Sequence, residues 1–442
     1  MGLQGRQRGG EGGGMNAAII MGILFFVLLI SGLPISFATG LAAMVYILLT
    51  PNIPAILIPQ RMFVTVDSFA LMAIPLFILA GELMNSGGIT RKIVDFSSKL
   101  VGHITGGLAH ISILACMIFA GMCGSCTAAG VSVGSMMIPA LKKENYDVDF
   151  SAAVIASAAV LGPVIPPSII MVVYASLTGT SVAKLFLGGI APGIIIGMLL
   201  MFTAYRISKK RGYQAKLAKR CSLKEIMVSF RKSLAALLLP IVIIGGILSG
   251  MFTATEAGAI GVAYAGAVGF LSGEIHISDV KRILLNAAKS STNILFLMGT
   301  GAVFGWILTS LQIPQMMTRL LIGISSQPQI LMLIIIAFVL FLGCFLADAA
   351  IVPVLAPLLF PVIQQVGIDP VAFGVILCTT AVVGNITPPV GGLLFVISGV
   401  GNVSVTKTAR AVLPFLAVIV CVLVACGIFP QIVTTIPDLL MK

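Results

Sequence analysis

Charged residues are scarce in this sequence. Asp, Glu, Lys and Arg together make up 9% of its 442 residues, whereas a soluble globular protein carries about 25%. Hydrophobic residues make up 59%, and apolar runs of roughly 17–25 residues, each long enough to cross a bilayer, recur from end to end. So few charges cannot give a folded chain a wetted surface, which excludes a soluble protein. The composition predicts an all-α, polytopic membrane protein in a lipid bilayer.

Further absences exclude whole classes of function. No GxxxxGK[ST] loop occurs, so we expect no direct use of ATP. The three histidines, His103, His110 and His276, are too widely spaced to form a metal site. The net charge of +12 would suit nucleic acid, but the basic residues cluster in connectors between apolar runs, above all in 206–232. That placement is typical of cytoplasmic loops that follow the positive-inside rule, so we expect no nucleic-acid partner.

An internal repeat organises the chain. Residues 222 positions apart match in type: the pairs are Gly121 and Gly343, Pro139 and Pro361, Asp147 and Asp369, Gly162 and Gly384, Pro166 and Pro388, Pro167 and Pro389, Gly179 and Gly401, and Pro192 and Pro414. A shared Pro-Pro pair within one gapless frame predicts a duplication. We expect a first repeat at 15–205 and a second at 233–442, joined by a basic cytoplasmic linker at 206–232. Residues 1–14, which look like a tag or linker, are expected to lie outside the fold.

Each repeat is expected to hold the same elements. These are scaffold helices within 17–86 and 234–311, helical hairpins at 106–141 and 329–365, broken helices at 151–177 and 371–399, and closing helices at 183–205 and 411–433. Proline lacks a backbone N–H, and the residue before it avoids the α region, so the Pro-Pro pairs predict helix interruptions at 162–168 and 384–391. Such irregular backbone is tolerated at membrane depth only where it is buried in protein or lines a cavity.

The basic residues predict the topology. If 106–141 and 329–365 are re-entrant hairpins, most of the 26 lysines and arginines fall on one side of the membrane, which is then the cytoplasmic side. The exceptions are Arg6, Arg8, Arg61, Lys184, Arg319 and Lys442. The first hairpin then enters from the cytoplasm and the second from the opposite face, so the repeats are inverted and both termini lie outside. Inverted repeats with interrupted helices are typical of secondary transporters.

The CGSC stretch at 123–126 has the spacing of a thiol–disulfide redox motif. One interpretation is a membrane thiol–disulfide oxidoreductase that uses Cys123 and Cys126. The repeat favours another, because these cysteines correspond to Phe345 and Asp348, whereas a redox device needs thiols that exchange. Nearly all of the eight cysteines lie in apolar segments, and we expect them to be free thiols. In the second interpretation the two cysteines are small packing residues beside an ion site.

Asp348 is the sharpest candidate for a functional residue. An ionisable group inside a membrane segment is costly and marks a functional site by default, and no Lys or Arg lies near it in the sequence. An unpaired carboxylate there suits Na⁺ or H⁺; a protonated or hydrogen-bonded structural aspartate is the alternative. Other carboxylates have plainer roles. Glu256 ends a T-x-x-E capping box, Asp147 and Asp369 fit helix caps, and Glu82 fits a position near a membrane surface.

Six segments together are similar to the large permease subunit of the tripartite ATP-independent periplasmic (TRAP) transporters. They are IPLFILAGELMNSGGITRKIVDF (74–96), GMCGSCTAAGVSVGSMMIPAL (121–141), GPVIPPSIIMVVYA (162–175), TATEAGAIGVAYA (253–265), GIDPVAFGVI (367–376) and GNITPPVGGLLFV (384–396). The resemblance covers essentially everything from residue 15 onward. Where Cys123 and Cys126 stand, the family usually has serine or another small residue.

The resemblance implies a Na⁺-driven importer of small organic acids, such as C4-dicarboxylates or sialic acid, that works by an elevator mechanism in the bacterial inner membrane. It implies a small Q-type membrane subunit and a periplasmic P-type substrate-binding protein as partners, and two or more co-transported Na⁺. Carried over by residue, Na⁺ would be bound by Gly124, Ser125, Thr127, Gly162, Val164, Pro166, Asp348, Gly384, Ile386, Thr387 and Pro389. Substrate would be bound by Ser125, Thr127, Pro167, Ser168, Asn385, Thr387 and Pro388. A passive channel stays open as an alternative, because it too would account for broken helices.

Overall fold

The computed structural model describes residues 4–50 and 53–441. Within these residues the regular structure is entirely helical. Six of the helices are long and apolar enough to cross a membrane, or up to eight spans if two bent pairs each count as one. This confirms the predicted all-α polytopic membrane fold. The parts of the predicted N-terminal extension, first scaffold region and second repeat that fall on 1–3, 51–52 and 442 lie outside the described residues.

Both halves of the chain follow the same order of elements. The first half contains α1 (Gln4–Ile30), α2 (Ile35–Leu49), α3 (Leu57–Val66), the 3₁₀ helix η1 (Ala70–Met72), α4 (Ala73–Ser86), α5 (Ile89–Val101), α6 (Gly107–Cys123), α7 (Cys126–Lys143), α8 (Val148–Ala159), α9 (Ile169–Thr178) and α10 (Val182–Arg211). The second contains α11 (Leu223–Leu248), α12 (Ala254–Leu271), α13 (Ile277–Ser310), α14 (Ile313–Ile324), α15 (Pro328–Gly343), α16 (Asp348–Val366), α17 (Pro370–Gly384), α18 (Gly392–Gly401), α19 (Val405–Ile428) and α20 (Gln431–Leu440).

Several helices run past their expected bounds. α1 begins at Gln4, inside the stretch that the sequence placed outside the fold. α13 is one continuous helix of 34 residues within the second scaffold region, and no proline interrupts it. In the first half the corresponding segment is divided, and the chain turns by 68° between α3 and the η1–α4 stretch. The basic linker is also largely helical: α10 extends into it, and α11 begins within it behind a capping box of Ser222 and Glu225.

The pair α6–α7 is a hairpin whose two ends lie against one segment of the linker. Before α6, the carbonyl of Gly102 accepts a hydrogen bond from the Leu217 amide at 3.0 Å. After α7, Glu144 forms an ion pair with Lys216 at 2.8 Å. The chain therefore enters and leaves this hairpin on the side where the basic linker lies.

The loop between α7 and α8 corrects one expected cap. Asp147 precedes α8, but its carboxylate makes no capping hydrogen bond. It accepts hydrogen bonds from Arg211 and from the Tyr213 hydroxyl instead, each at 2.7 Å. Its counterpart Asp369 does cap its helix, accepting from two amides at the start of α17. Glu256 completes the predicted capping box at the start of α12.

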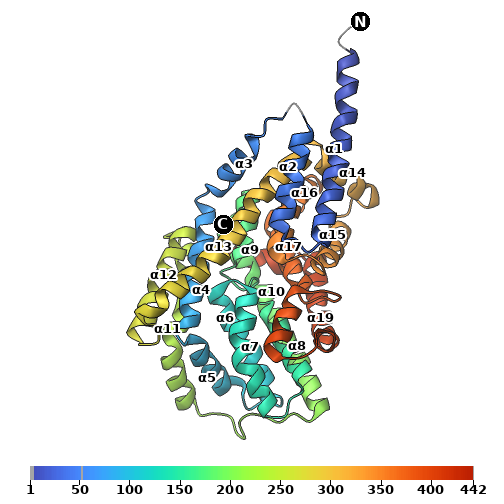
Figure 1. Ribbon diagram of the computed structural model, residues 1–442. Helices are drawn as coiled ribbons and strands as arrows, with labels where there is room; N and C mark the ends of the chain where they lie inside the picture. Colours follow the sequence, from blue (N-terminus) through green and yellow to red (C-terminus); the bar gives the residue numbers. More distant parts are fainter. Residues whose placement is uncertain (1–3, 51–52, 442) are drawn as a thin grey trace.

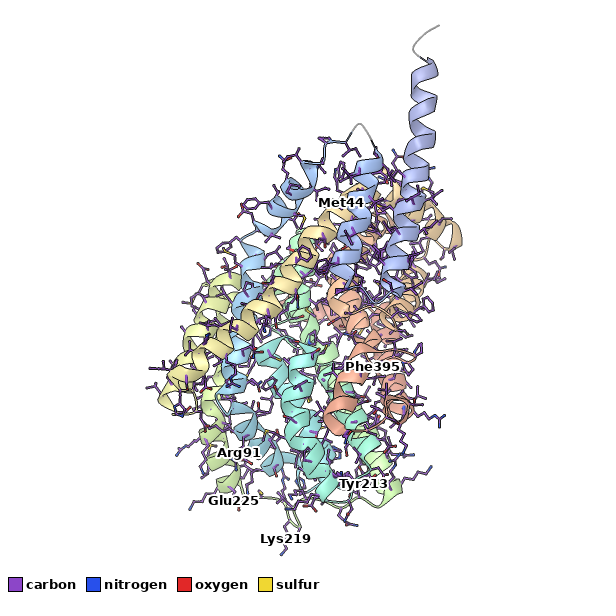
Figure 2. The ribbon with its side chains drawn as sticks, viewed as in Figure 1. Met44, Arg91, Tyr213, Lys219, Glu225 and Phe395 are labelled. Carbon is purple, nitrogen blue, oxygen red and sulfur yellow. The ribbon has the colours of Figure 1, made fainter. Side chains whose placement is uncertain are left out.

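The two halves are arranged in opposite directions. In Figure 1 the first hairpin and α8 occupy the lower half of the molecule, and α15, α16 and α17 occupy the upper half. Within each half the entering arm of the hairpin packs on the first part of the broken helix, α6 on α8 and α15 on α17. Lys219 and Glu225, both within the linker, lie at the lower end in Figure 2.

The first parts of the two broken helices, α8 and α17, form the centre of the molecule. Every residue of 150–164 and of 371–386 is buried. The outer helices instead expose large apolar side chains, such as Ile30 of α1 (84% exposed) and Leu271 of α12 (89%). Apolar surface on the outside, with the first helix break enclosed, is the arrangement that a bilayer requires.

Candidate functional site

The tip of the first hairpin is a tight turn. Gly124 ends α6 in the left-handed region, at φ +62°, where glycine carries no steric penalty. Ser125 begins α7, and its hydroxyl accepts a hydrogen bond from the Ala128 amide. A Cβ atom on Gly124 would lie 2.7 Å from the carbonyl oxygen of Pro167. Glycine is thus needed both for the turn and for the close approach of the tip to the first helix break.

The first break joins α8 to α9 and packs against that tip. Ser168 caps α9, accepting from the Met171 amide and donating to the Pro163 carbonyl. The bond between Pro166 and Pro167 is cis. A Cβ on Gly162 would lie 2.7 Å from the carbonyl oxygen of Ser125, so tip and break are in backbone contact.

The second hairpin and the second break make the equivalent contact. Gly343, at the end of α15, approaches Gly384, at the end of α17, so closely that a Cβ on Gly343 would lie 2.6 Å from the Gly384 Cα. The amide of Gly391 donates to the carbonyl of Cys344 at 3.0 Å. Pro388 and Pro389 are joined by a cis bond, as in the first half.

The two hairpin tips meet at a cavity of about 190 Å³. Residues from both halves line it: Gly124, Ser125, Cys126, Thr127, Pro163, Ile169, Ile170, Val173, Ile294, Asp348 and Ala349. The thiol of Cys126 lies 3.8 Å from Oδ2 of Asp348, and the Asn385 amide nitrogen lies 3.9 Å from the same sulfur. Cys126 and Asp348 occupy equivalent positions in the two repeats. Their contact therefore marks the pseudo-two-fold axis that relates the halves. We call this space the tip cavity.

The structure brings part of the predicted site together. Ser125, Thr127 and Asp348 share the tip cavity with Gly124, and Asn385 reaches its edge through Cys126. Other predicted residues pack in the walls behind it and are buried: Gly162, Val164, Pro166, Pro167, Ser168, Gly384 and Ile386. The Thr387 hydroxyl donates to the Val383 carbonyl, while Pro388 is half-buried and Pro389 is exposed.

The sequence missed a neighbour of the first tip. A second cavity of about 110 Å³ lies between α4 and the first hairpin, lined by Glu82 and Asn85 together with Cys123 and Ser125. The Ser132 hydroxyl of α7 donates to the Asn85 side chain at 2.8 Å. The sequence does contain a sign of this cavity, because Glu82 is a carboxylate inside the apolar run of α4. It does not show that α4 packs against the first hairpin tip.

The tip cavity has the ligands of a hard cation. It offers one carboxylate and two hydroxyls, oxygen donors of the kind that such ions prefer. Among the described residues Asp348 forms no ion pair and no Lys or Arg lines the cavity. The residues present therefore fit a bound Na⁺. The N-termini of α7 and α16 also meet here, and their dipoles favour negative charge.

The cysteines show no sign of a redox pair. All eight are free thiols, and Cys123 and Cys126 are both buried. They stand at the facing ends of α6 and α7, where small side chains fill the tip.

Comparison with known proteins agrees with this architecture. The sequence model described as "Tripartite ATP-independent periplasmic transporter, DctM component" matches residues 22–432. The sialic acid TRAP transporter large permease protein SiaM of Vibrio cholerae is 39% identical over 94% of this chain and 96% of its own length. The C4-dicarboxylate TRAP transporter large permease protein DctM of Pseudomonas aeruginosa is 38% identical over 86% of this chain and 88% of its own.

More distant likeness shows the fold. The YdaH transporter of Alcanivorax borkumensis superposes with a TM-score of 0.63 at 15% identity, covering 84% of this chain and 88% of YdaH. MtrF of Neisseria gonorrhoeae gives a TM-score of 0.59 at 14% identity, covering 84% of this chain and 83% of MtrF. The relatives at 38–39% identity are permease subunits and not oxidoreductases. We therefore discard the oxidoreductase interpretation. The chain belongs to the DctM component family of the tripartite ATP-independent periplasmic transporters.

Proposed function

We propose that this chain is the permease of a Na⁺-coupled importer of small organic acids in the bacterial inner membrane. Relatives are named for sialic acid, C4-dicarboxylate and 2,3-diketo-L-gulonate, and all three are carboxylates. The acid would be handed over by a periplasmic binding protein to a complex of this chain with a small membrane subunit, partners that family membership implies. The basic linker would be cytoplasmic and both termini periplasmic.

Asp348 carries the ion coupling. Its carboxylate faces the tip cavity beside the hydroxyl-bearing Ser125 and Thr127, and no cationic side chain among the described residues pairs with it. An isolated carboxylate at membrane depth is costly, and a bound Na⁺ relieves that cost. The second helix break would complete a further Na⁺ site through its backbone carbonyls, freed where Pro388 and Pro389 interrupt the ladder.

The charge of the cavity sets the order of binding. A substrate carboxylate that enters the tip cavity comes close to the carboxylate of Asp348. Two negative charges in one small, poorly solvated cavity repel each other strongly. Neither lysine nor arginine is among the described lining residues. Na⁺ therefore has to bind with or before the acid, and we expect little binding of the acid without Na⁺.

Two groups of packed helices would serve as the two bodies of an elevator movement. The hairpins and broken helices pack on one another across the halves, α9 on α16 and α7 on α18. The helices α4 and α12 pack together, and α13 lies beside α2, α3 and α4. In the proposed cycle the first body carries the tip cavity across the membrane while the second body holds its position.

Uptake into proteoliposomes tests the proposal. The vesicles contain this chain and its small subunit, with the binding protein outside, and receive labelled succinate or N-acetylneuraminate with an inward Na⁺ gradient or with choline. Asp348→Asn should lose at least about tenfold in Na⁺-driven uptake, since one charge-assisted contact contributes roughly 1.5–3 kcal/mol. Asp438→Asn, which alters an exposed aspartate of α20, is the matched control and should transport normally. Uptake that ignored both Na⁺ and Asp348 would favour a passive channel.

A further inference from the structure

A larger cavity lies apart from the tip cavity. Its volume is about 450 Å³, and it shares no lining residue with the tip cavity. It is enclosed by α3 and α13 on one side and by α9 and α16 on the other. α3 and α16 lie in the upper half of the molecule in Figure 1, whereas Lys219 of the basic linker lies at the lower end in Figure 2. The cavity therefore lies in the half of the molecule opposite the linker.

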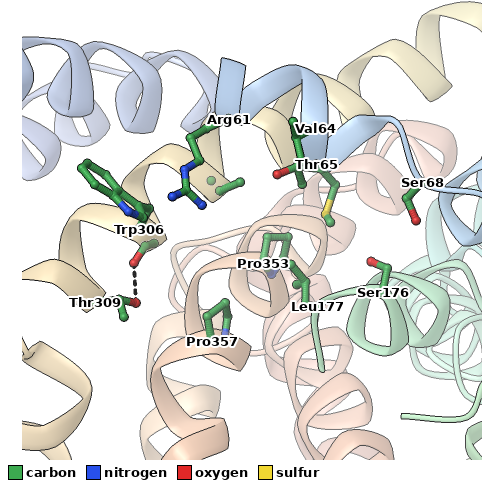
Figure 3. Close-up of a pocket in the computed structure, with 14 residues that line it drawn as sticks. Arg61, Val64, Thr65, Ser68, Ser176, Leu177, Trp306, Thr309, Pro353 and Pro357 are labelled. Carbon is green, nitrogen blue, oxygen red and sulfur yellow. Dashed lines mark hydrogen bonds between the residues drawn. The ribbon is translucent and has the colours of Figure 1, made fainter. Parts of the chain in front are cut away.

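Arg61 is the charged group of this cavity. Its guanidinium carbon lies 5.4 Å from the ring centroid of Trp306, within the range of a cation–π contact. Figure 3 shows the guanidinium beside the Trp306 ring and above Pro353. Among the described residues Arg61 forms no ion pair. No Asp or Glu is among the described lining residues either.

The geometry leaves the donors of Arg61 free. A guanidinium next to an aromatic ring still directs its N–H groups outward in its own plane, in the fork that matches a carboxylate. The ring also limits the rotation of the side chain, so less conformational entropy is lost when an anion binds.

Hydroxyl-bearing side chains also line the Arg61 side and the far side of this cavity. Thr65 and Ser68 of the α3 side and Ser176 and Thr309 of the other helices line the same cavity. The Ser176 and Thr309 hydroxyls donate to carbonyls of their own helices, at 2.8 Å each. The Thr65 and Ser68 side chains are half-buried, and their hydroxyls can donate to a ligand in the cavity.

We propose that this cavity, which we call the Arg61 cavity, is a second binding site for a small carboxylate, distinct from the tip cavity. Arg61 binds the carboxylate through two N–H groups, Trp306 fixes the guanidinium, and Thr65 and Ser68 bind further polar groups of the acid. The choice of ligand rests on the proposed function; the anion site itself rests on the residues of the cavity. It lies between the helices of the two bodies, on the half where acid would arrive from the binding protein. Unlike the tip cavity, it needs no Na⁺, because a cationic side chain is already present.

The sole tryptophan of the sequence makes the site measurable. The full chain is placed in nanodiscs of zwitterionic lipid, in choline buffer without Na⁺, and Trp306 fluorescence is recorded during titration with succinate and N-acetylneuraminate. A saturable change is expected with at least one acid and none with the neutral succinamide. Arg61→Gln should weaken binding by about tenfold or more, and Arg61→Lys by less, since it keeps the charge but not the fork. Arg319→Gln, at an exposed arginine of α14, should leave the titration unchanged.

The outcomes separate this proposal from the transport proposal. An Arg61-dependent signal in a protein whose uptake ignores Na⁺ would leave the Arg61 cavity standing and overturn the coupling. Na⁺-driven uptake with no fluorescence response, and with Arg61→Gln as active as the unaltered chain, would overturn the Arg61 cavity alone. A signal that appears only when phosphatidylglycerol is added to the nanodisc would assign the guanidinium to a lipid headgroup and would equally overturn the carboxylate site.

Discussion

Gly124→Ala tests the contact between the first hairpin tip and the first helix break. The new methyl group has two separate effects. It forces alanine into the left-handed region, at φ +62°, which costs about 1–2 kcal/mol. It also lies 2.7 Å from the Pro167 carbonyl oxygen, a clash that only a shift of the tip can relieve, and overpacking of this kind costs typically about 1–3 kcal/mol.

Gly179→Ala separates these effects. Gly179 ends α9 at φ +73°, and a Cβ there meets no heavy atom within 4 Å. It should therefore show the backbone cost alone, about 1–2 kcal/mol, and transport normally. Gly124→Ala should lose about 2–5 kcal/mol of unfolding free energy when the two terms are combined, and most of its Na⁺-driven uptake, since the displaced tip carries Ser125 and Thr127.

The assay is thermal unfolding of both variants, followed by Na⁺-driven uptake in proteoliposomes at equal amounts of folded protein. If Gly124→Ala matched Gly179→Ala in both stability and uptake, the close approach of the first tip to the first break would contribute neither to folding nor to transport. The assignment of the tip cavity as the transport site would then lose its structural basis.

Three further predictions concern other parts of the chain. The double variant Cys123→Ser, Cys126→Ser should keep Na⁺-driven uptake, because serine is close to cysteine in size and its hydroxyl can keep the contact of residue 126 with Asp348; loss of uptake in this variant, together with the same loss when the unaltered chain is treated with a reductant, would support the redox interpretation. Burial raises the pKa of Tyr146, in the α7–α8 loop, from 10.0 to about 12. The folding stability linked to its neutral hydroxyl is complete below pH 10 and is lost as the pH rises to about 12. The free energy of unfolding of Tyr146→Phe should therefore change less with pH over that interval than that of the unaltered chain, and equal slopes would contradict this. Gly384→Ala should prevent folding or abolish uptake, because the backbones of Gly343 and Gly384 are in contact; a stable, active variant would show that the second tip and break are not packed as described.

The positions of glycine and proline in the sequence predict much of this architecture. The Pro-Pro pairs place both helix breaks, and Gly124 and Gly343 stand at the hairpin tips. Residues of these two types constrain the backbone locally, so their effect can be predicted without knowledge of tertiary packing. The capping box at Glu256 is local for the same reason and was predicted correctly.

What depends on packing between distant segments could not be predicted. The sequence placed Asp147 as a cap, because nothing local shows that Arg211 and Tyr213 reach it from the linker. The contact of Cys126 with Asp348 requires the two halves to be placed on a common axis. The pairing of Arg61 with Trp306 joins segments that no repeat or motif relates.

The most direct test of Na⁺ coupling reverses the driving force. Proteoliposomes with the complete transporter, equal Na⁺ on both sides and a trace of ²²Na⁺ outside receive an inward gradient of the transported acid. The proposed mechanism predicts that the acid drives uphill accumulation of ²²Na⁺, and that Asp348→Asn abolishes this accumulation while Asp438→Asn does not. Entry of the acid with no accompanying movement of ²²Na⁺ would contradict coupled import.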